Sequence, residues 1–324
     1  MRQDVINGRG RSALASAALL VVGLGLAPEA EAQLRPSYMH GQNVAPAYEG
    51  WVEHEDGSRS IVFGYMNRNW EEEPHVPVGP DNHFSPGPAD RGQPTVFLPR
   101  RNRFVFEVPV PDDFGPDEEL VWTLTVNGET ETAYGSLNPE YRIDNMVIMS
   151  ETGALGAGSS DENIRANEPP EIEVEGDLER TVRVGEPLEL VALVTDDGLP
   201  PERGVNRPDE DATPDQLLQR ALNPPVRITV NKAVALHYTW FVYRGEGKVT
   251  FDPHQVKPWE DTRPFANSPW APAWVPPDQP EDGRWVATAV FHDPGTYVLR
   301  GRADDGGLYS DVELTVHVTD DLTP

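Results

Sequence analysis

Apolar and polar residues alternate over short segments along most of this chain, which is the pattern of β-strands with one buried face. In the first half the alternation is clearest at Ile61 to Tyr65, Phe104 to Val110 and Trp122 to Val126. Turn signals separate these segments, with Asp56-Gly57 before the first and Asn127-Gly128 after the last. The pattern predicts an all-β domain of about six or seven strands, built as a sandwich.

The second half divides into strands in the same way. Its last segment alternates without a fault, and Trp240 stands in a middle strand where sandwiches of this kind keep a core tryptophan. The predicted strands are Glu171 to Val174 with Thr181 to Val184, Leu188 to Val194, Leu236 to Val242, Trp285 to Phe291, Tyr297 to Ala303 and Val312 to Thr319.

Tyr297 has the spacing of a tyrosine corner. In immunoglobulin-like sandwiches this tyrosine lies near the start of strand F, two residues before an inward core position, and its hydroxyl bonds to the backbone just upstream. Here the core position is Leu299, and the turn before the strand is Asp293-Pro294-Gly295. This motif predicts an immunoglobulin-like fold for the second half.

Three blocks in the second half resemble one family. They are Trp240 to Phe251 (W-x-x-x-x-G-x-G-x-V-x-F), Pro294 to Arg300, and Ala303-Asp304-Asp305-Gly306. Together they resemble the PKD-type immunoglobulin-like domains of bacterial exported proteins over roughly residues 170–319. The resemblance implies a spacer or adhesive module. Two segments, 198–235 and 252–284, are longer than the usual loops, and the N-terminal half resembles uncharacterised exported bacterial proteins, which implies no activity.

The N-terminus has the features of an export signal. A basic stretch with Arg2, Arg9 and Arg11 precedes an apolar run that is shorter than the roughly 20 residues of a membrane span, and Ala30-Glu31-Ala32 matches a cleavage site. We therefore expect a periplasmic or secreted protein with no membrane span in the mature chain. The expected organisation is a signal peptide at 1–32, a β-sandwich domain at 33–150, a linker at 151–169 and the immunoglobulin-like domain at 170–320.

Composition narrows the possible partners. The chain has no cysteine, which excludes disulfides and thiolate-bound zinc, and its formal net charge is −28. A field of that sign repels phosphate backbones, so nucleic acid is excluded as a partner. Calcium, an envelope protein with a basic surface, or a polysaccharide remain as candidate partners. Solubility alone also explains such a charge.

An acidic cluster is the first candidate site. Strands B and F of this fold run in the same direction, so the loops after them should bring the pair Asp196 and Asp197 near Asp304 and Asp305, with Asp311 close by. Carboxylates from converging loops can bind Ca²⁺, which takes six to eight oxygen ligands. The alternative, which we favour, is that each aspartate caps its own turn by accepting backbone N–H groups, since no EF-hand spacing is present.

A second candidate is aromatic. Trp259, Phe265, Trp270 and Trp274 lie in the proline-rich segment 252–284, and the three tryptophans are candidate ligand-binding residues. Aromatic faces on a loop can stack on a sugar or a partner surface. The alternative, which we favour, is that these rings are buried against the sheets, because exposed apolar patches of that size are uncommon on monomers.

Signatures of catalysis are missing from the sequence. No G-x-S-x-G elbow and no phosphate loop occur, and His75 and His83 flank Asp81 without a metal-binding spacing. We expect solvent-facing positions for His237 and His317, and a long loop, either functional or disordered, at 71–94. The sequence favours an exported non-catalytic binding or spacer protein of the bacterial cell envelope. The alternative is an enzyme or carbohydrate-binding protein that acts on an extracellular polymer through the tryptophan-rich segment.

Overall fold

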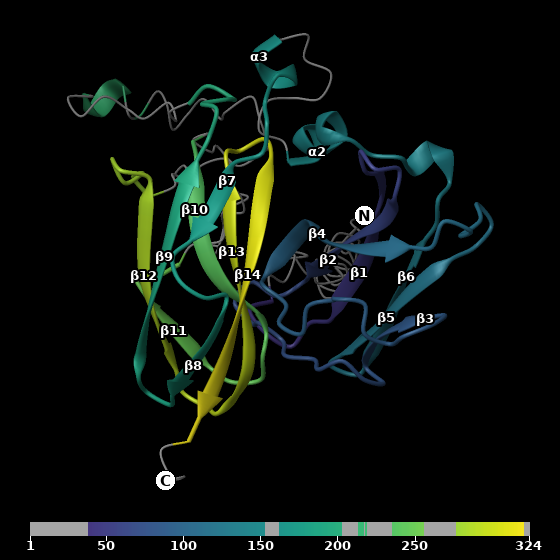
Figure 1. Cartoon of the computed structure of the whole chain (residues 1–324), viewed down its shortest axis with the longest axis horizontal. Helices are drawn as coiled ribbons and strands as arrows, with labels where there is room; N and C mark the ends of the chain where they lie inside the picture. The colour runs from purple at the N-terminus through teal and green to yellow at the C-terminus, as the bar shows by residue number, and fades with distance from the viewer. Residues whose placement is uncertain are drawn as a thin grey trace, which may run out of the picture. The chain divides into compact units, whose positions relative to one another are not determined.

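The computed structural model contains two sandwiches of β-strands (Figure 1). It describes residues 38–152, 162–202, 213–216, 218, 235–255 and 277–320, and the expected signal peptide lies outside these residues. From Tyr38 onwards the chain forms one compact unit. The predicted all-β sandwich fold is confirmed.

The first sandwich has two three-stranded sheets. One sheet has the order β1-β2-β4 and the other β3-β5-β6. Asn127 and Gly128, both with positive φ (53° and 82°), make the tight turn between β5 and β6, as their sequence predicts. The strands are β1 (Val44–Glu53), β2 (Arg59–Asn67), β3 (Asn82–Ser85), β4 (Arg100–Val110), β5 (Leu120–Val126) and β6 (Glu129–Gly135); the short helices η1 (Pro139–Tyr141), α2 (Asn145–Thr152) and α3 (Glu162–Arg165) follow.

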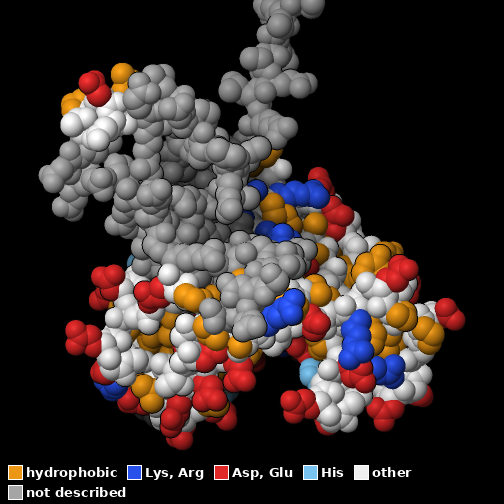
Figure 2. Space-filling model, turned by 90° about the horizontal axis from the view of Figure 1, so that it is seen from above, with side chains coloured by type: hydrophobic (Ala, Val, Ile, Leu, Met, Phe, Trp, Pro, Cys, Tyr) orange, Lys and Arg blue, Asp and Glu red, His pale blue; other side chains and the backbone are white. Residues whose placement is uncertain are grey.

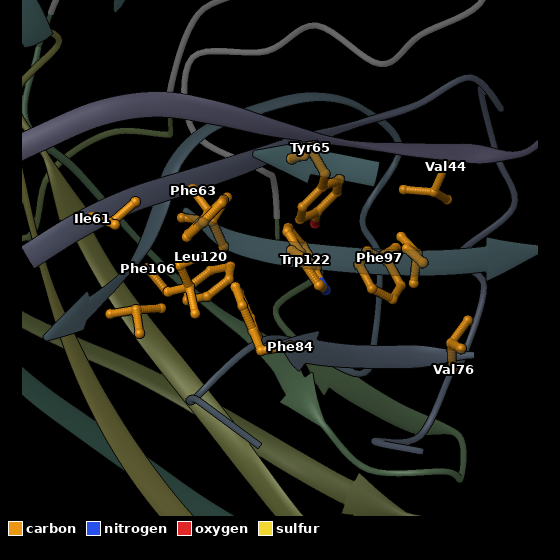
Figure 3. Packing of buried hydrophobic residues seen from close by; sticks show 14 of the residues in the cluster. Val44, Ile61, Phe63, Tyr65, Val76, Phe84, Phe97, Phe106, Leu120 and Trp122 are labelled. Carbon is orange, nitrogen blue, oxygen red and sulfur yellow. The ribbon is translucent and has the colours of Figure 1, made fainter. Parts of the chain in front are cut away.

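Aromatic rings fill the core of this sandwich (Figure 3). Trp122 is fully buried, stacks on Phe84 with ring centroids 5.8 Å apart and meets Phe106 edge-on at 5.1 Å. Phe63 packs against all three of these rings. Offset and edge-on contacts of this kind add to the burial of each ring, so the alternating aromatic positions explain why the strands pair with this register.

The segment 71–94, expected to be a long loop that is either functional or disordered, contributes Val76 and Phe84 to this core. It contains β3, and the buried side chain of Asn82 donates to the carbonyl oxygens of Val76 and Pro94 at 2.9 Å each. The same side chain accepts the indole N–H of Trp122 at 2.9 Å. Asn82 therefore ties both ends of the segment to the central tryptophan. Proline and glycine dominated the sequence pattern and hid this polar anchor.

The second sandwich has immunoglobulin-like topology. Its sheets have the orders β11-β12-β9-β7 and β10-β13-β14-β8. The first strand is split between them, with β7 antiparallel to β9 and β8 parallel to β14, as in immunoglobulin domains. The strands are β7 (Glu171–Val174), β8 (Glu179–Arg183), β9 (Pro187–Thr195), β10 (His237–Arg244), β11 (Val249–Asp252), β12 (Arg284–Phe291), β13 (Gly295–Asp304) and β14 (Tyr309–Thr319).

The tyrosine corner and the core tryptophan are confirmed. The Tyr297 hydroxyl donates to the carbonyl oxygen of Asp293 at 2.8 Å, and Leu299 and Trp240 are 0 % and 1 % exposed. Gly247 passes so close to the Tyr297 hydroxyl that a Cβ at this position would overlap it. This approach gives a physical reason for the second glycine of the G-x-G pattern.

Each sandwich caps an open strand edge of the other. The carbonyl oxygen of Tyr243, on edge strand β10, accepts the N–H groups of Thr95 and Val96 at 3.1 and 3.3 Å. On edge strand β4, the carbonyl oxygen of Phe104 accepts the Tyr309 hydroxyl at 2.5 Å. Exposed strand edges are templates for unwanted pairing, so this mutual capping protects both sheets.

No helix among the described residues is long and apolar enough to cross a membrane.

Candidate functional site

The main feature that could carry a function is the interface between the two sandwiches. Phe241, Tyr243 and Val298 stand on the outer face of the sheet β10-β13-β14-β8. Tyr243 nevertheless belongs to the core cluster of the first sandwich, and Phe241 and Val298 are partly buried against that cluster. Tyr243 is only 2 % exposed. The immunoglobulin-like sandwich therefore inserts apolar side chains from its outer face into its neighbour's core.

Arg300 is the central polar residue of the interface. It is 5 % exposed, and its guanidinium lies 3.4 Å from the ring centroid of Tyr243. Its Nη1 donates to the carbonyl oxygen of Val105 in the first sandwich, and its Nη2 donates to Glu313, both at 2.5 Å. One side chain thus stacks, pairs with a carboxylate and bonds to a strand edge, so its position is fixed from three sides.

A second polar group lies beside it. The Tyr243 hydroxyl donates to the carbonyl oxygen of Gly92 at 2.5 Å, and Arg244 forms a two-pronged ion pair with Asp90 at 2.7 and 3.0 Å. The Nε of Arg244 also donates to the carbonyl oxygen of Gln93 at 2.8 Å. These bonds hold the turn at 90–93 of the first sandwich against β10 of the second.

Electrostatics keep the interface charges in their ionised forms. Burial lowers the pKa of Arg300. The nearby Tyr243, Asp311 and Glu313 together raise it by more than burial lowers it, so the pKa lies above its usual value. Burial also raises the pKa of Tyr243 to about 12. The hydrogen bond from Arg244 lowers the pKa of Asp90. The pairs therefore stay charged through the physiological pH range.

A polar cleft of about 470 Å³ opens beside these contacts. One wall is β4 of the first sandwich, and the other wall is the outer face of β13 and β14. Both acidic and basic side chains reach it, together with the hydroxyl of Ser310. The cleft is lined by Gly92, Phe104, Val105, Phe106, Glu107, Tyr243, Arg244, Val298, Arg300, Tyr309, Ser310, Asp311 and Glu313.

A serine, a histidine and a glutamate meet at the edge of this cleft without forming a catalytic triad. His54 Nε2 lies 2.9 Å from the Ser60 hydroxyl and 3.3 Å from the Glu107 carboxylate. In a triad the serine and the acid contact opposite nitrogens of the ring, so that the acid holds the histidine in the tautomer that accepts a proton. Ser60 is moreover 3 % exposed. The geometry does not produce an activated nucleophile at this position.

The predicted acidic residues engage mainly the backbone of their own loops. Asp304 accepts the N–H of Gly306 at 2.8 Å, and Asp305 accepts those of Gly307 and Leu308 at 2.5 and 2.7 Å. Likewise, Asp196 accepts from Gly198 at 2.9 Å and Asp197 from Leu199 at 2.8 Å. These hydrogen bonds are those of aspartates that cap their own turns, the expected alternative to calcium binding.

Asp311, the fifth predicted ligand, contacts an arginine side chain and not the backbone of a turn. It forms a two-pronged ion pair with Arg302, both distances being 2.7 Å. Among the described residues no group of three or more His, Cys, Asp or Glu side chains has the geometry to hold a metal ion. Calcium binding stays a prediction.

The pKa of the Asp305 carboxyl group is strongly raised. Asp305 is 2 % exposed, and burial raises its pKa to about 7 against the opposing effect of its backbone hydrogen bonds, with the charge of Asp196 adding to the increase. The backbone N–H of Glu168 donates to the Asp197 carboxylate at 3.1 Å. The Asn167 side chain donates to the second oxygen of the Asp305 carboxylate at 3.1 Å.

The aromatic candidates Trp259, Phe265, Trp270 and Trp274 lie outside the described residues. Among the histidines, the side chain of His317 is 40 % exposed, as expected, and lies 2.9 Å from Glu179. The expectation for His237 was wrong: it is 2 % exposed and its ring meets Trp285 edge-on at 5.8 Å. Strand parity assigned His237 to a polar face, but parity could not reveal that this end of the strand is covered.

The interface residues were not predicted from the sequence, although one signal was present. Phe241 and Tyr243 alternate with Trp240 and Val242, so β10 is apolar on both of its faces, and Val298 continues the second face on β13. A strand that is apolar on both faces is covered on both faces. The sequence therefore contained evidence that something packs on this sheet, but not what packs there.

The molecular surface is strongly acidic, as the net charge of −28 requires. Figure 2 shows acidic side chains spread over the visible face, with Lys and Arg confined to a few places. This surface repels other polyanions and sets the electrostatic background for any partner.

Known proteins with a similar arrangement of strands share little sequence with this chain. No family profile and no curated protein match the chain. Domains 4 and 5 of the S-layer protein SbsC align with 86 % of this chain and 98 % of theirs, at 9 % identity and a TM-score of 0.22. Immunoglobulin domains 1–4 of Sidekick-1 align with 85 % of this chain and 47 % of theirs (10 % identity, TM-score 0.21), and titin domains I67–I69 with 86 % and 65 % (9 % identity, TM-score 0.21). At these scores the immunoglobulin-like assignment rests on the strand topology.

Proposed function

We propose that this protein is an exported, non-catalytic component of the bacterial cell envelope that acts as a rigid two-sandwich spacer and binding unit. The observation that supports the spacer role is the interface, where Tyr243 and Arg300 fix one sandwich on the other. The export signal predicted from the first 32 residues supports the location. The PKD-type motifs support the same class of role, since modules of that family mostly space or attach something else.

The physical argument concerns domain mobility. Interfaces between domains of one chain are by default modest and polar, and the domains then move relative to each other. Here a tyrosine that is 2 % exposed belongs to the neighbouring core, and an arginine that is 5 % exposed bonds across the boundary. Separating the sandwiches would expose the apolar surface of Tyr243 and leave the carbonyl oxygen of Val105 without its donor. A fixed orientation between modules is what a spacer needs.

The experiment measures the relative orientation of the two sandwiches in solution and the cellular compartment of the protein. Small-angle X-ray scattering on residues 33–324 should fit a single relative orientation of the sandwiches. The double variant Tyr243→Ala/Arg300→Ala should fit only an ensemble of orientations. The same purified protein should cosediment with envelope prepared from the source bacterium, and the endogenous protein should fractionate outside the cytoplasm.

Two outcomes would contradict the proposal. One is a wild-type scattering curve that requires many orientations, which removes the spacer role. The other is a hydrolytic activity on an extracellular polymer that disappears when a single loop carboxylate is changed, for example in Asp197→Asn. That second result would favour the enzyme alternative and direct attention to the tryptophan-rich segment.

A further inference from the structure

The interface cleft has the size and position of a small-molecule site. Its volume of about 470 Å³ falls within the range of roughly 300–1,000 Å³ that is usual for ligand pockets, which occur preferentially where domains meet. Its walls come from both sandwiches and are fixed by the contacts of Arg300 and Tyr243. The cleft is therefore preformed, and a ligand would not have to order it.

Its lining offers both hydrogen-bond acceptors and donors. Glu107 and Glu313 line the cleft with side chains that are 47 % and 50 % exposed, so their carboxylates can accept hydrogen bonds from a ligand. Arg244 is 23 % exposed and donates, and Ser310 can do either. Between these groups Val298 supplies an apolar surface. The lining therefore combines charged and polar groups with a small apolar surface.

The charges exclude an anionic ligand. Three carboxylates, those of Glu107, Asp311 and Glu313, line the cleft against the two guanidinium groups of Arg244 and Arg300. Both guanidinium groups already pair with carboxylates, Arg244 with Asp90 and Arg300 with Glu313. A phosphate or carboxylate entering the cleft would meet a surplus of like charge without a free cation to bind.

The neighbouring strand edge is unsuited to peptide addition. The carbonyl oxygens of Phe104 and Val105 already accept from Tyr309 and Arg300, and Pro109 further along β4 has no N–H to donate. An added strand needs an uninterrupted row of backbone donors and acceptors. The chemistry that remains is a neutral ligand whose own groups both donate and accept at close spacing.

We propose that the interface cleft binds a short neutral saccharide. Adjacent hydroxyl groups of a sugar donate to the carboxylates of Glu107 and Glu313 and accept from Arg244, while a C–H face of the ring lies on Val298. This inference rests on the proposed function and names the class of its bound partner. It places the binding site at the interface and not on the tryptophan-rich segment.

The test uses three neutral disaccharides, cellobiose, maltose and N,N′-diacetylchitobiose, with residues 33–324. Saturation-transfer NMR detects binding and isothermal titration calorimetry measures affinity. We expect at least one disaccharide to bind, and Glu107→Gln to weaken it at least tenfold, because Gln keeps the shape but loses the charged acceptor. Glu107 takes no part in the hydrogen bonds that Arg300 and Tyr243 make across the interface, so this variant should fold normally.

Matched variants locate the site. Glu189→Gln removes an exposed carboxylate from β9 and should bind as the wild type does. Trp270→Ala should also leave the affinity unchanged. The inference is overturned if none of the three disaccharides binds, if Glu107→Gln and Glu313→Gln both retain full affinity, or if Trp270→Ala alone abolishes binding. The proposed function can be tested independently. If one relative orientation fits the scattering curve and the protein associates with the envelope, but no saccharide binds, only this inference is overturned.

Discussion

The guanidinium of Arg300 lies 3.4 Å from the ring centroid of Tyr243, and both side chains come from the outer face of the same sheet. The stacked pair is buried by the other sandwich, because Tyr243 bonds to Gly92 and Arg300 bonds to Val105. An outer face that in an isolated domain would be solvated is here an internal surface. The two sandwiches therefore form one mechanical unit.

Replacing Arg300 should destabilise the whole chain. Arg300→Ala removes the stacking on Tyr243 and leaves the buried carbonyl oxygen of Val105 without a donor, so we expect a loss of about 2–4 kcal/mol in the free energy of unfolding. Urea denaturation of residues 33–324 measures it. Arg284→Ala is the control, because its ion pair with Glu175 is about half exposed and screened by solvent, so it should contribute little to stability. Equal losses in the two variants would show that Arg300 has no special role.

The tyrosine corner should contribute through its hydroxyl. Tyr297→Phe keeps the buried ring and removes only the hydrogen bond to Asp293, so the expected loss is about 1 kcal/mol. Tyr134→Phe is the matched control, since that side chain is 54 % exposed. Thermal melts of both variants decide the matter, and an unchanged melting temperature in Tyr297→Phe would contradict the prediction.

Gly301 should not tolerate even a methyl group. A Cβ at this position would overlap the Tyr238 hydroxyl and approach Trp240 to 3.0 Å, both in the core. Gly301→Ala should therefore cost about 1–3 kcal/mol or more through overpacking. Gly115→Ala, where the nearest atom is 3.6 Å from the added Cβ, should be close to neutral. The same melts as above compare the two, and a stable Gly301→Ala would mean that the core relaxes around it.

Asp305→Asn should stabilise the protein at alkaline pH. The folded-state pKa is raised from 3.8 to about 7, so on going from about pH 4 to pH 7 the unfolded state loses its proton first and stability falls. Above pH 7 the full penalty, up to about 4 kcal/mol, is present. The variant lacks this penalty, so its advantage in melting temperature should be largest at pH 8 and vanish near pH 4.

The local geometry supports this substitution. The amide introduced in Asp305→Asn would keep an oxygen to accept the N–H groups of Gly307 and Leu308. Its new N–H₂ group would face Asn167, whose own buried Oδ1 has no hydrogen-bond partner and can turn to accept it. A variant that is less stable than wild type at every pH would contradict the raised pKa and assign Asp305 a purely structural role as an anion.

Calcium provides a separate test of the acidic loops. If Asp196 and Asp305 bind the ion, millimolar calcium should raise the melting temperature of residues 33–324 above its value in chelator, since saturation at about 100 times the dissociation constant adds roughly 2.7 kcal/mol. Because one carboxylate oxygen of each residue already accepts backbone N–H groups of its own turn, we expect no increase. An increase that Asp305→Asn abolishes would establish the metal site.

Local patterns were enough to predict many individual strands. Alternation at Trp122 to Val126 and the turn at Asn127-Gly128 predicted a hairpin that the structure contains, because side-chain period and turn conformation are properties of neighbouring residues. The tyrosine corner is of the same kind, since Tyr297 and Asp293 are four residues apart. By contrast, the anchoring of segment 71–94 by Asn82 escaped prediction because its partner, Trp122, is 40 residues away.

The candidate site likewise has features that depend on neighbouring residues and features that depend on residues far apart in the sequence. The sequence by itself determined the all-β class, the immunoglobulin-like core around Trp240 and Leu299, and the acidic turns, all of which depend on residues close along the chain or on strand parity. Only the tertiary structure decided that Arg300 meets Val105, 195 residues away, and that a cleft opens beside them. Contacts between residues so far apart in the sequence form when the surfaces of the two folded sandwiches pack together. The free energy of this packing depends on both surfaces at once. No local pattern in either half encodes it.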